Sequence, residues 1–298
     1  MAARAWRVRL ACVAAMSAAA VAACSLSLDG FTGADDAGAT PDASSDAIAP
    51  SGDDASMAAD ASDAGGERDA DASDGACPSG RGPDMVRVPT GFCIDSTEVT
   101  TTQYAAFLAS SPPFSDQPAE CAWNTSFVPA SAWPPAASED AFPVRAVDWC
   151  DAFAFCAWSG KHLCGKVGGG SLPSADFASP ALSQWMNACT QAGAHAYVYG
   201  DSYDATKCNG DVVDGGPEGG SIVAVKSFPS CQSYPGVYDL LGNVDEWEDS
   251  CNGTTGANDA CRLRGEGYGE MTALRCDAPE AHVRSTSNDD QGIRCCAE

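Results

Sequence analysis

The chain has 298 residues with 41 acidic and 16 basic side chains, a formal net charge of −25, and it contains 16 cysteines. This acidity argues against nucleic acid as a partner, because the phosphate backbone is bound through clustered Lys and Arg. The cysteines indicate a disulfide framework formed in an oxidising compartment. No Cys-x-x-Cys pair occurs and the three histidines are scattered, which argues against a zinc site.

Residues 1–23 are typical of an export signal, with three arginines before an apolar run that is too short to span a bilayer. Two alanines close the run directly before Cys24. This junction resembles the lipobox of bacterial lipoproteins, so we expect Cys24 to be the lipidated N-terminus. Ordinary signal cleavage is the alternative. The lipidated protein would be anchored in the bacterial cell envelope, with Ser25 favouring the outer membrane.

Residues 24–76 have the composition of a linker. They are almost entirely Ala, Asp, Ser, Gly, Thr and Pro, with 13 acidic residues and one basic residue. Such a segment cannot bury enough apolar surface to offset its ordering entropy, so we expect a disordered tether that reaches roughly 40 Å. That leaves 77–298 as a single globular domain with 28 acidic and 12 basic residues.

The domain begins with two predicted strands. Residues 85–89 and 91–95 alternate apolar and polar side chains, with a turn between them. Residues 98–108 then change to helical spacing. A second helix is predicted from Asp148, a favoured N-cap residue, to the residues before Gly160.

Less regular sequence surrounds these elements. Residues 110–142 are rich in Pro, Ser and Ala and predict irregular surface packing. A third short helix is expected at 180–189 and a strand at 222–226.

The most informative stretch is 236–248, which reads Gly-Val-Tyr-Asp-Leu-Leu-Gly-Asn-Val-Asp-Glu-Trp-Glu. Its apolar residues predict a buried segment. Gly242 and Asn243 predict a sharp turn, because both residue types tolerate positive φ. On these grounds alone, the segment is a piece of core that turns and runs on into Glu246 and Trp247.

The same stretch resembles the Gly-(Leu/Val)-Tyr-Asp-Met-x-Gly-Asn-Val-Trp-Glu-Trp signature of the formylglycine-generating enzyme family, also called sulfatase-modifying factors. Residues 143–163, 262–268 and 292–295 resemble further family motifs, so the resemblance extends over 77–298. It implies an irregular, loop-rich α+β fold, related to C-type lectin-like domains, with a small antiparallel sheet, short helices and disulfide staples.

The resemblance also implies two long-range disulfides, while proximity in sequence suggests three local ones. The long-range pairs are Cys156 with Cys295 and Cys189 with Cys276. The local pairs are Cys77 with Cys93, Cys208 with Cys231 and Cys251 with Cys261, and the partners of Cys121, Cys150, Cys164 and Cys296 stay open.

Calcium is the metal that the resemblance implies, at two sites built largely from backbone carbonyls with Asn and Asp oxygens. Ordinary turn-forming loop residues are the alternative interpretation of these positions. The first site would contain Asn209 and Gly210 with Asp214 or Glu218, and the second would contain Ser233, where the family has Asn, with Tyr234 and Gly236.

The family's catalytic chemistry depends on two cysteines, five residues apart, that hold copper(I). The matching positions in this chain are Glu270 and Arg275. Neither side chain supplies the soft thiolate that copper(I) selects. Cys276 comes one residue later and aligns with a structural cysteine of the family. We therefore expect no copper site and no catalytic residue.

These observations favour a non-catalytic binding or scaffolding module that is tethered to a membrane and recognises an envelope protein or a glycan. One alternative is a copper-dependent oxidase that converts a sulfatase cysteine to formylglycine with rearranged cysteines, or a relative with a different metal-dependent oxidation. The other is a purely structural envelope protein.

Overall fold

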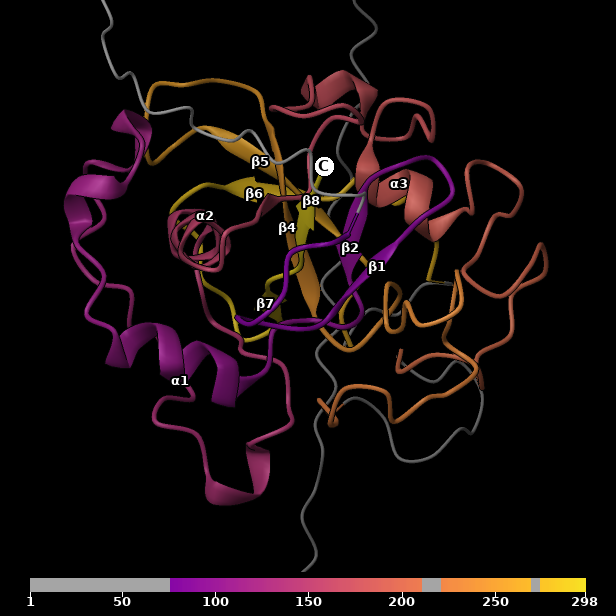
Figure 1. Cartoon of the computed structure of the whole chain (residues 1–298), viewed down its shortest axis with the longest axis horizontal. Helices are drawn as coiled ribbons and strands as arrows, with labels where there is room; N and C mark the ends of the chain where they lie inside the picture. The colour runs from indigo at the N-terminus through magenta and orange to yellow at the C-terminus, as the bar shows by residue number, and fades with distance from the viewer. Residues whose placement is uncertain (1–75, 211–220, 269–273) are drawn as a thin grey trace, which may run out of the picture. The chain divides into compact units, whose positions relative to one another are not determined.

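The computed structural model describes residues 76–210, 221–268 and 274–298. The expected export signal, Cys24 and nearly all of the tether lie outside these ranges. Within them, eight strands of two to seven residues, three α-helices and four 3-10 helices alternate with long irregular connections (Figure 1). None of these helices is long and apolar enough to cross a membrane. The α+β, loop-rich class predicted from the sequence is confirmed.

The first sheet brings the end of the chain beside its beginning. Its strand order is β1-β2-β8-β3, and all neighbours are antiparallel. Strand β2 is buried throughout, although alternation predicts a half-buried strand, because Ile94 enters the hydrophobic core while Asp95 is covered by Lys161. The bounds are Met85–Arg87 for β1, Cys93–Asp95 for β2, His162–Leu163 for β3 and Cys295–Ala297 for β8.

A second sheet, not expected from the sequence, has the order β6-β5-β4-β7. Its β4–β5 and β5–β6 pairs are antiparallel, whereas β4 and β7 are parallel. The regular structure is thus two small sheets, one of them mixed, in place of a single antiparallel sheet. The bounds are Asp245–Cys251 for β4, Ala260–Arg264 for β5, Ala281–Val283 for β6 and Gln291–Gly292 for β7.

Each α-helix of the described ranges begins directly after a residue whose side chain accepts a hydrogen bond from the first turn. Such caps satisfy backbone amides that have no partner within the helix. The third helix is shorter than predicted because Ser183, not Pro180, supplies its cap. The helices and their caps are α1, Thr101–Ala109, after Thr100; α2, Trp149–Trp158, after Asp148; and α3, Gln184–Cys189, after Ser183.

The strand predicted at 222–226 is wrong. The Val223 amide donates to the side-chain oxygen of Asn243 at 3.0 Å, and the Val225 amide donates to the Ala141 carbonyl at 3.0 Å. Side-chain and loop acceptors therefore satisfy this backbone, and it joins no sheet. The predicted irregularity of residues 110–142 agrees with the structure, which contains only the 3-10 helices Phe114–Asp116, Ala119–Cys121 and Ala137–Glu139 there.

The 236–248 stretch links the two hydrophobic clusters of the core. Leu240 and Leu241 pack in one cluster, and Trp247 packs in the other. Gly242 and Asn243 turn the chain between them with φ of +78° and +66°. The predicted turn is therefore present at the centre of the fold. In Figure 1, α2 and α3 lie on opposite sides of the strands to which this stretch leads.

Seven disulfides join all 14 cysteines of the described residues. The long-range pairs staple α2 and α3 to the last part of the chain, and closing loops of this length contributes roughly 4–5 kcal/mol each in the chain-entropy description. The pairs implied by the family resemblance, Cys156–Cys295 and Cys189–Cys276, are among them, as are Cys77–Cys93, Cys208–Cys231 and Cys251–Cys261; the remaining pairs are Cys121–Cys150 and Cys164–Cys296.

Candidate functional site

The position of the family's second copper thiolate is occupied by a half-exposed arginine. Arg275 forms two parallel hydrogen bonds to Asp277, Nε to Oδ1 at 2.7 Å and Nη2 to Oδ2 at 3.1 Å. This contact raises the pKa of the Arg275 guanidinium and lowers that of the Asp277 carboxyl. Glu270, at the first thiolate position, lies outside the described residues. The guanidinium of Arg275 is therefore held by Asp277.

Aromatic rings border this arginine. The Arg275 guanidinium lies 5.7 Å from the centre of the Tyr197 ring, and that ring stacks on Tyr199 at 5.6 Å with an interplanar angle of 8°. Tyr203 completes the group at 5.9 Å from Tyr197. The arginine–tyrosine surface at the family's catalytic position thus consists of Arg275 beside Tyr197, with Tyr199 and Tyr203 packed against Tyr197.

The described residues do not fit a copper(I) ion. Copper(I) requires soft ligands such as free thiolates, and the nearest cysteine in sequence, Cys276, is bonded to Cys189 at 2.03 Å. The other cysteines of the described ranges are paired as well. No cluster of three or more His, Cys, Asp or Glu side chains suited to a metal ion exists among the described residues.

At the first expected calcium site, Asn209 acts as a structural brace. Its backbone carbonyl accepts from the Asn243 amide at 2.7 Å, and its side-chain amide donates to Asn243 Oδ1 at 3.0 Å. Gly210 fits closely under Leu274, whose Cδ1 lies 2.6 Å from the position that a Cβ would take. Asp214 and Glu218, the expected acidic ligands, fall outside the described ranges. Of this site the structure therefore describes only Asn209 and Gly210, and both have structural contacts.

The second expected calcium site contains one unsatisfied oxygen. Ser233, Tyr234 and Gly236 form a tight turn in which the Ser233 amide donates to the Val237 carbonyl at 3.0 Å and the Val237 amide donates to the Tyr234 carbonyl at 2.9 Å. The Ser233 hydroxyl is buried and has no hydrogen-bond partner among the described residues. A buried oxygen in this state fits a ligand of Ca²⁺, a hard ion that prefers oxygen donors.

The polar residues of the 236–248 stretch hold the core together. Glu246 Oε1 accepts from Arg294 Nε at 2.8 Å, and Glu246 Oε2 accepts from Trp185 Nε1 at 2.6 Å. Asn243 donates to Glu98 Oε1 at 3.0 Å. Burial, and then the charge of Asp239, raise the pKa of Glu98 well above its ordinary value. These side chains are buried and bonded to one another, so they serve as internal braces.

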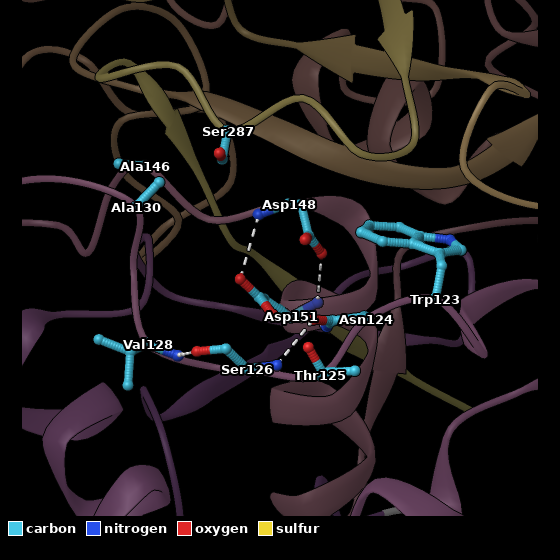
Figure 2. Close-up of a pocket in the computed structure, with 10 residues that line it drawn as sticks. All are labelled: Trp123, Asn124, Thr125, Ser126, Val128, Ala130, Ala146, Asp148, Asp151 and Ser287. Carbon is cyan, nitrogen blue, oxygen red and sulfur yellow. Dashed lines mark hydrogen bonds between the residues drawn. The ribbon is translucent and has the colours of Figure 1, made fainter.

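A separate pocket of about 230 Å³ opens beside the start of α2 (Figure 2). It lies between that helix and the segment that the Cys121–Cys150 disulfide fastens to it. Sequence reasoning did not find this pocket; the only local signal is Trp123-Asn124 next to a cysteine in an otherwise featureless region. The lining residues are Trp123, Asn124, Thr125, Ser126, Val128, Ala130, Ala146, Asp148, Asp151 and Ser287.

The chain is similar to solved structures at low sequence identity. CarF is 22% identical and has a TM-score of 0.47, with 69% of this chain and 85% of CarF covered. PvdO from Pseudomonas aeruginosa is 19% identical and has a TM-score of 0.45, with 70% of this chain and 80% of PvdO covered.

Sequence relatives include both inactive and active proteins of one family. "Inactive C-alpha-formylglycine-generating enzyme 2" of Bos taurus is 29% identical over 170 residues, 52% of this chain and 50% of that protein. "Formylglycine-generating enzyme" of Mus musculus is 26% identical over 178 residues, 52% of this chain and 44% of that protein. The chain thus spans about half the length of these relatives.

A protein-family model described as "Sulfatase-modifying factor enzyme 1-like domain" matches residues 51–298, which is most of the chain. This match includes every described element and the arginine–tyrosine surface. By this match the chain belongs to the sulfatase-modifying-factor family.

Proposed function

We propose that this protein is a non-catalytic member of the sulfatase-modifying-factor family that serves as a binding or scaffolding module. The observation that carries the proposal is that every cysteine of the described residues is in a disulfide, while Arg275 stands at a copper-thiolate position. A thiolate pair that reacts with substrate has to be unpaired, accessible and correctly spaced. The relatives do not decide the question, because both inactive and active proteins are among them.

The competing function is that of a copper-dependent oxidase that converts a sulfatase cysteine to formylglycine. It would require both the Cys189–Cys276 and the Cys251–Cys261 disulfides to open, so that Cys276 and Cys261 supply the thiolates. Incubation of the oxidised domain with copper and a Cys-x-Pro-x-Arg peptide tests it, with mouse formylglycine-generating enzyme as the positive control. We expect the peptide mass to stay unchanged. The mass loss that marks conversion of the cysteine to an aldehyde would refute the non-catalytic proposal.

The binding surface in this proposal is displayed from the bacterial cell envelope by a lipid on Cys24, at the outer membrane, with residues 24–76 as the spacer. The support is the sequence of the export signal and its junction with Cys24. We expect Cys24→Ala to move the protein from the membrane fraction to the soluble fraction. Retention of this variant in the membrane fraction would contradict the anchor. The partner in this proposal is an envelope protein or a glycan.

A further inference from the structure

The pocket at the start of α2 has an aromatic wall and an acidic floor (Figure 2). Trp123 donates its Nε1 proton to the Glu120 carbonyl at 2.9 Å, so the carbon ring is what it offers to the pocket. Asp148 and Asp151 lie opposite and are more than nine-tenths buried. Thus two carboxylates in a largely water-excluded position share one small pocket with an indole.

The two carboxylates differ in how many of their oxygens accept hydrogen bonds. Asp151 Oδ1 accepts from Asn124 Nδ2 at 2.9 Å, and Asp151 Oδ2 accepts from the Asp148 amide at 3.3 Å. Asp148 Oδ1 caps α2 by accepting from the Asp151 amide at 2.9 Å. No side chain of the described residues bonds to Asp148 Oδ2, although the Cys150 backbone amide also contacts this carboxylate. Asp148 is therefore the carboxylate of the pair with an oxygen that no side chain occupies.

The charge of this pair is not balanced by the protein. No Lys, Arg or His is among the residues that line the pocket. Burial raises the pKa of Asp148 to about 6, and burial together with the charge of Asp148 raises the pKa of Asp151. Six other buried carboxylates of the described residues have a cationic neighbour: Asp95 has Lys161, Glu246 has Arg294, Glu248 has Arg264, Asp259 has Arg284, and Glu98 and Asp239 both interact with Arg294.

Helix capping explains only part of this arrangement. A helix N-terminus carries roughly half a positive elementary charge, which is less than the charge of even one ionised carboxylate. Asn caps a helix about as well as Asp does. The N-cap position therefore does not by itself demand an acid at residue 148, and the pocket keeps a net negative charge after the helix is counted.

The pocket geometry suits an organic cation better than a metal ion. Ca²⁺ and Mg²⁺ require several oxygen ligands, whereas three of the four carboxylate oxygens here are already bonded within the protein. An ammonium group needs one carboxylate oxygen, one or two further acceptors and an aromatic ring within about 6 Å. Asp148, the Ser287 hydroxyl and the Trp123 ring all border the pocket and offer groups of these kinds, while the Ser126 hydroxyl already accepts from the Val128 amide at 3.1 Å.

We propose that the pocket formed by Trp123, Asp148 and Asp151 binds a primary or methylated ammonium group carried by a small molecule. The inference rests on the proposed binding role and deepens it by naming the ligand class. It concerns a pocket whose lining does not include Arg275, so ammonium binding and the absence of formylglycine chemistry are tested separately.

The test compares each charged probe with its uncharged counterpart of the same shape. Choline is paired with 3,3-dimethylbutan-1-ol, and protonated ethanolamine with propan-1-ol, in ligand-observed NMR titrations of the oxidised domain at pH 7 and low ionic strength, where screening is weak. We expect at least one charged probe to bind saturably and at least tenfold more tightly than its neutral counterpart. The two probe pairs distinguish a methylated from a primary ammonium ligand.

Matched variants assign the binding to the pocket. Asp148→Asn keeps a capping oxygen but removes the charge, and should weaken binding of the charged probe at least tenfold. Asp116→Asn removes one exposed charge elsewhere and should leave binding within twofold of wild type. Trp123→Leu removes the aromatic wall and is the second test if Asp148→Asn does not give the native seven disulfides and a cooperative melt.

Three results would overturn the inference. They are equal binding of charged and neutral probes, binding that neither Asp148→Asn nor Trp123→Leu weakens, and no saturable binding of any charged probe. None of them changes the expected result of the formylglycine assay, so failure here is distinguishable from failure of the proposed function.

Discussion

Acidic side chains buried inside the domain dominate its residue-scale chemistry. Arg294 lies at the centre of one group: it bonds to Glu246 through Nε, to the Asp95 carbonyl through Nη1 and to the Tyr238 carbonyl through Nη2. Its charge also opposes the upward pKa shifts that burial gives Glu98. Removing one partner of such a group costs about 3–5 kcal/mol, because the remaining charges stay buried. The charged residues of the 236–248 stretch and their partner Arg294 are thus largely internal braces.

Burial of these acids predicts that the fold is more stable in mild acid than at neutral pH. Burial raises the pKa values of Asp95, Asp148 and Asp239 from 3.8 to about 6. Between pH 4 and 6 the folded state therefore binds more protons than the unfolded state, and the stability present below pH 4 is lost as pH rises through 6. We expect the melting temperature to fall between pH 4.5 and pH 7.

Asp239→Asn isolates one of these groups. Asp239 has a φ of +58°, which Asn tolerates, and its Oδ2 accepts from the Lys226 amide at 2.6 Å, a role that an Asn oxygen can take. This variant should raise the melting temperature at pH 7 and reduce its pH dependence, whereas the exposed Asp116→Asn should change neither. A melting temperature of the wild type that rises from pH 4.5 to 7 would contradict the argument.

The unsatisfied hydroxyl of Ser233 predicts a calcium effect on stability. If Ca²⁺ binds at this turn, it stabilises the folded state by mass action. We expect millimolar Ca²⁺ to raise the melting temperature of the metal-free domain and Ser233→Ala to reduce that rise. Ser115→Ala, at an exposed position, is the control. An equal calcium response in all three proteins would place any bound calcium elsewhere.

At the scale of elements, the turn at Gly242 and Asn243 positions β4 and with it the second sheet. A Cβ at residue 242 would lie 2.2 Å from the Asn209 carbonyl oxygen, and this glycine has a φ of +78°. Both the clash and the backbone conformation therefore exclude larger residues. The atoms that a Cβ would meet belong to the backbone of Asn209, which cannot move aside as the end of a flexible side chain could.

We expect Gly242→Ala to lower the free energy of unfolding by more than 3 kcal/mol, since steric overlap adds to about 1–2 kcal/mol of left-handed strain. Gly91→Ala is the matched control, because Gly91 also has positive φ, +106°, but has no atom within 4 Å of a Cβ. Denaturant unfolding with intact disulfides measures both. Equal destabilisation by the two variants would show that the contact with Asn209 has no energetic weight.

Local chemistry determined which elements could be predicted. Asp148 acts within one turn of its helix, so the local sequence was sufficient to place the start of α2. Helical spacing predicted α1 from residue 98, but the helix begins at Thr101 because Thr100 is its cap. Residues 222–226 look like a strand, but their amides bond to Asn243 and to Ala141, contacts that sequence spacing does not encode. The pocket at Asp148 needs Trp123 and Ser287 brought together from distant segments, and no local pattern predicts that.

At the scale of the whole molecule, the seven disulfides hold a loop-rich fold together and leave no free thiol among the described residues. A protein with two thin sheets and few helices has a limited continuous core, and staples across long loops stabilise it by restricting the unfolded chain. Cys189 with Cys276 and Cys164 with Cys296 both join the middle of the domain to its C-terminal part. Disulfide bonds and free thiolates thus compete for the same cysteines in this chain.

This competition predicts that the folded domain contains no free thiol between residues 77 and 298. Alkylation of the native protein without reduction, followed by peptide mass spectrometry, should find none of the 14 domain cysteines modified, and reduction in denaturant should expose all of them. Cys276 and Cys261 are the informative residues, because they are the cysteines of this region that an oxidase would have to free. Alkylation of Cys276 together with Cys189, or of Cys261 together with Cys251, would mean that a disulfide is open in the native state. A reactive thiol would then be available for copper, and the non-catalytic function would lose its main support.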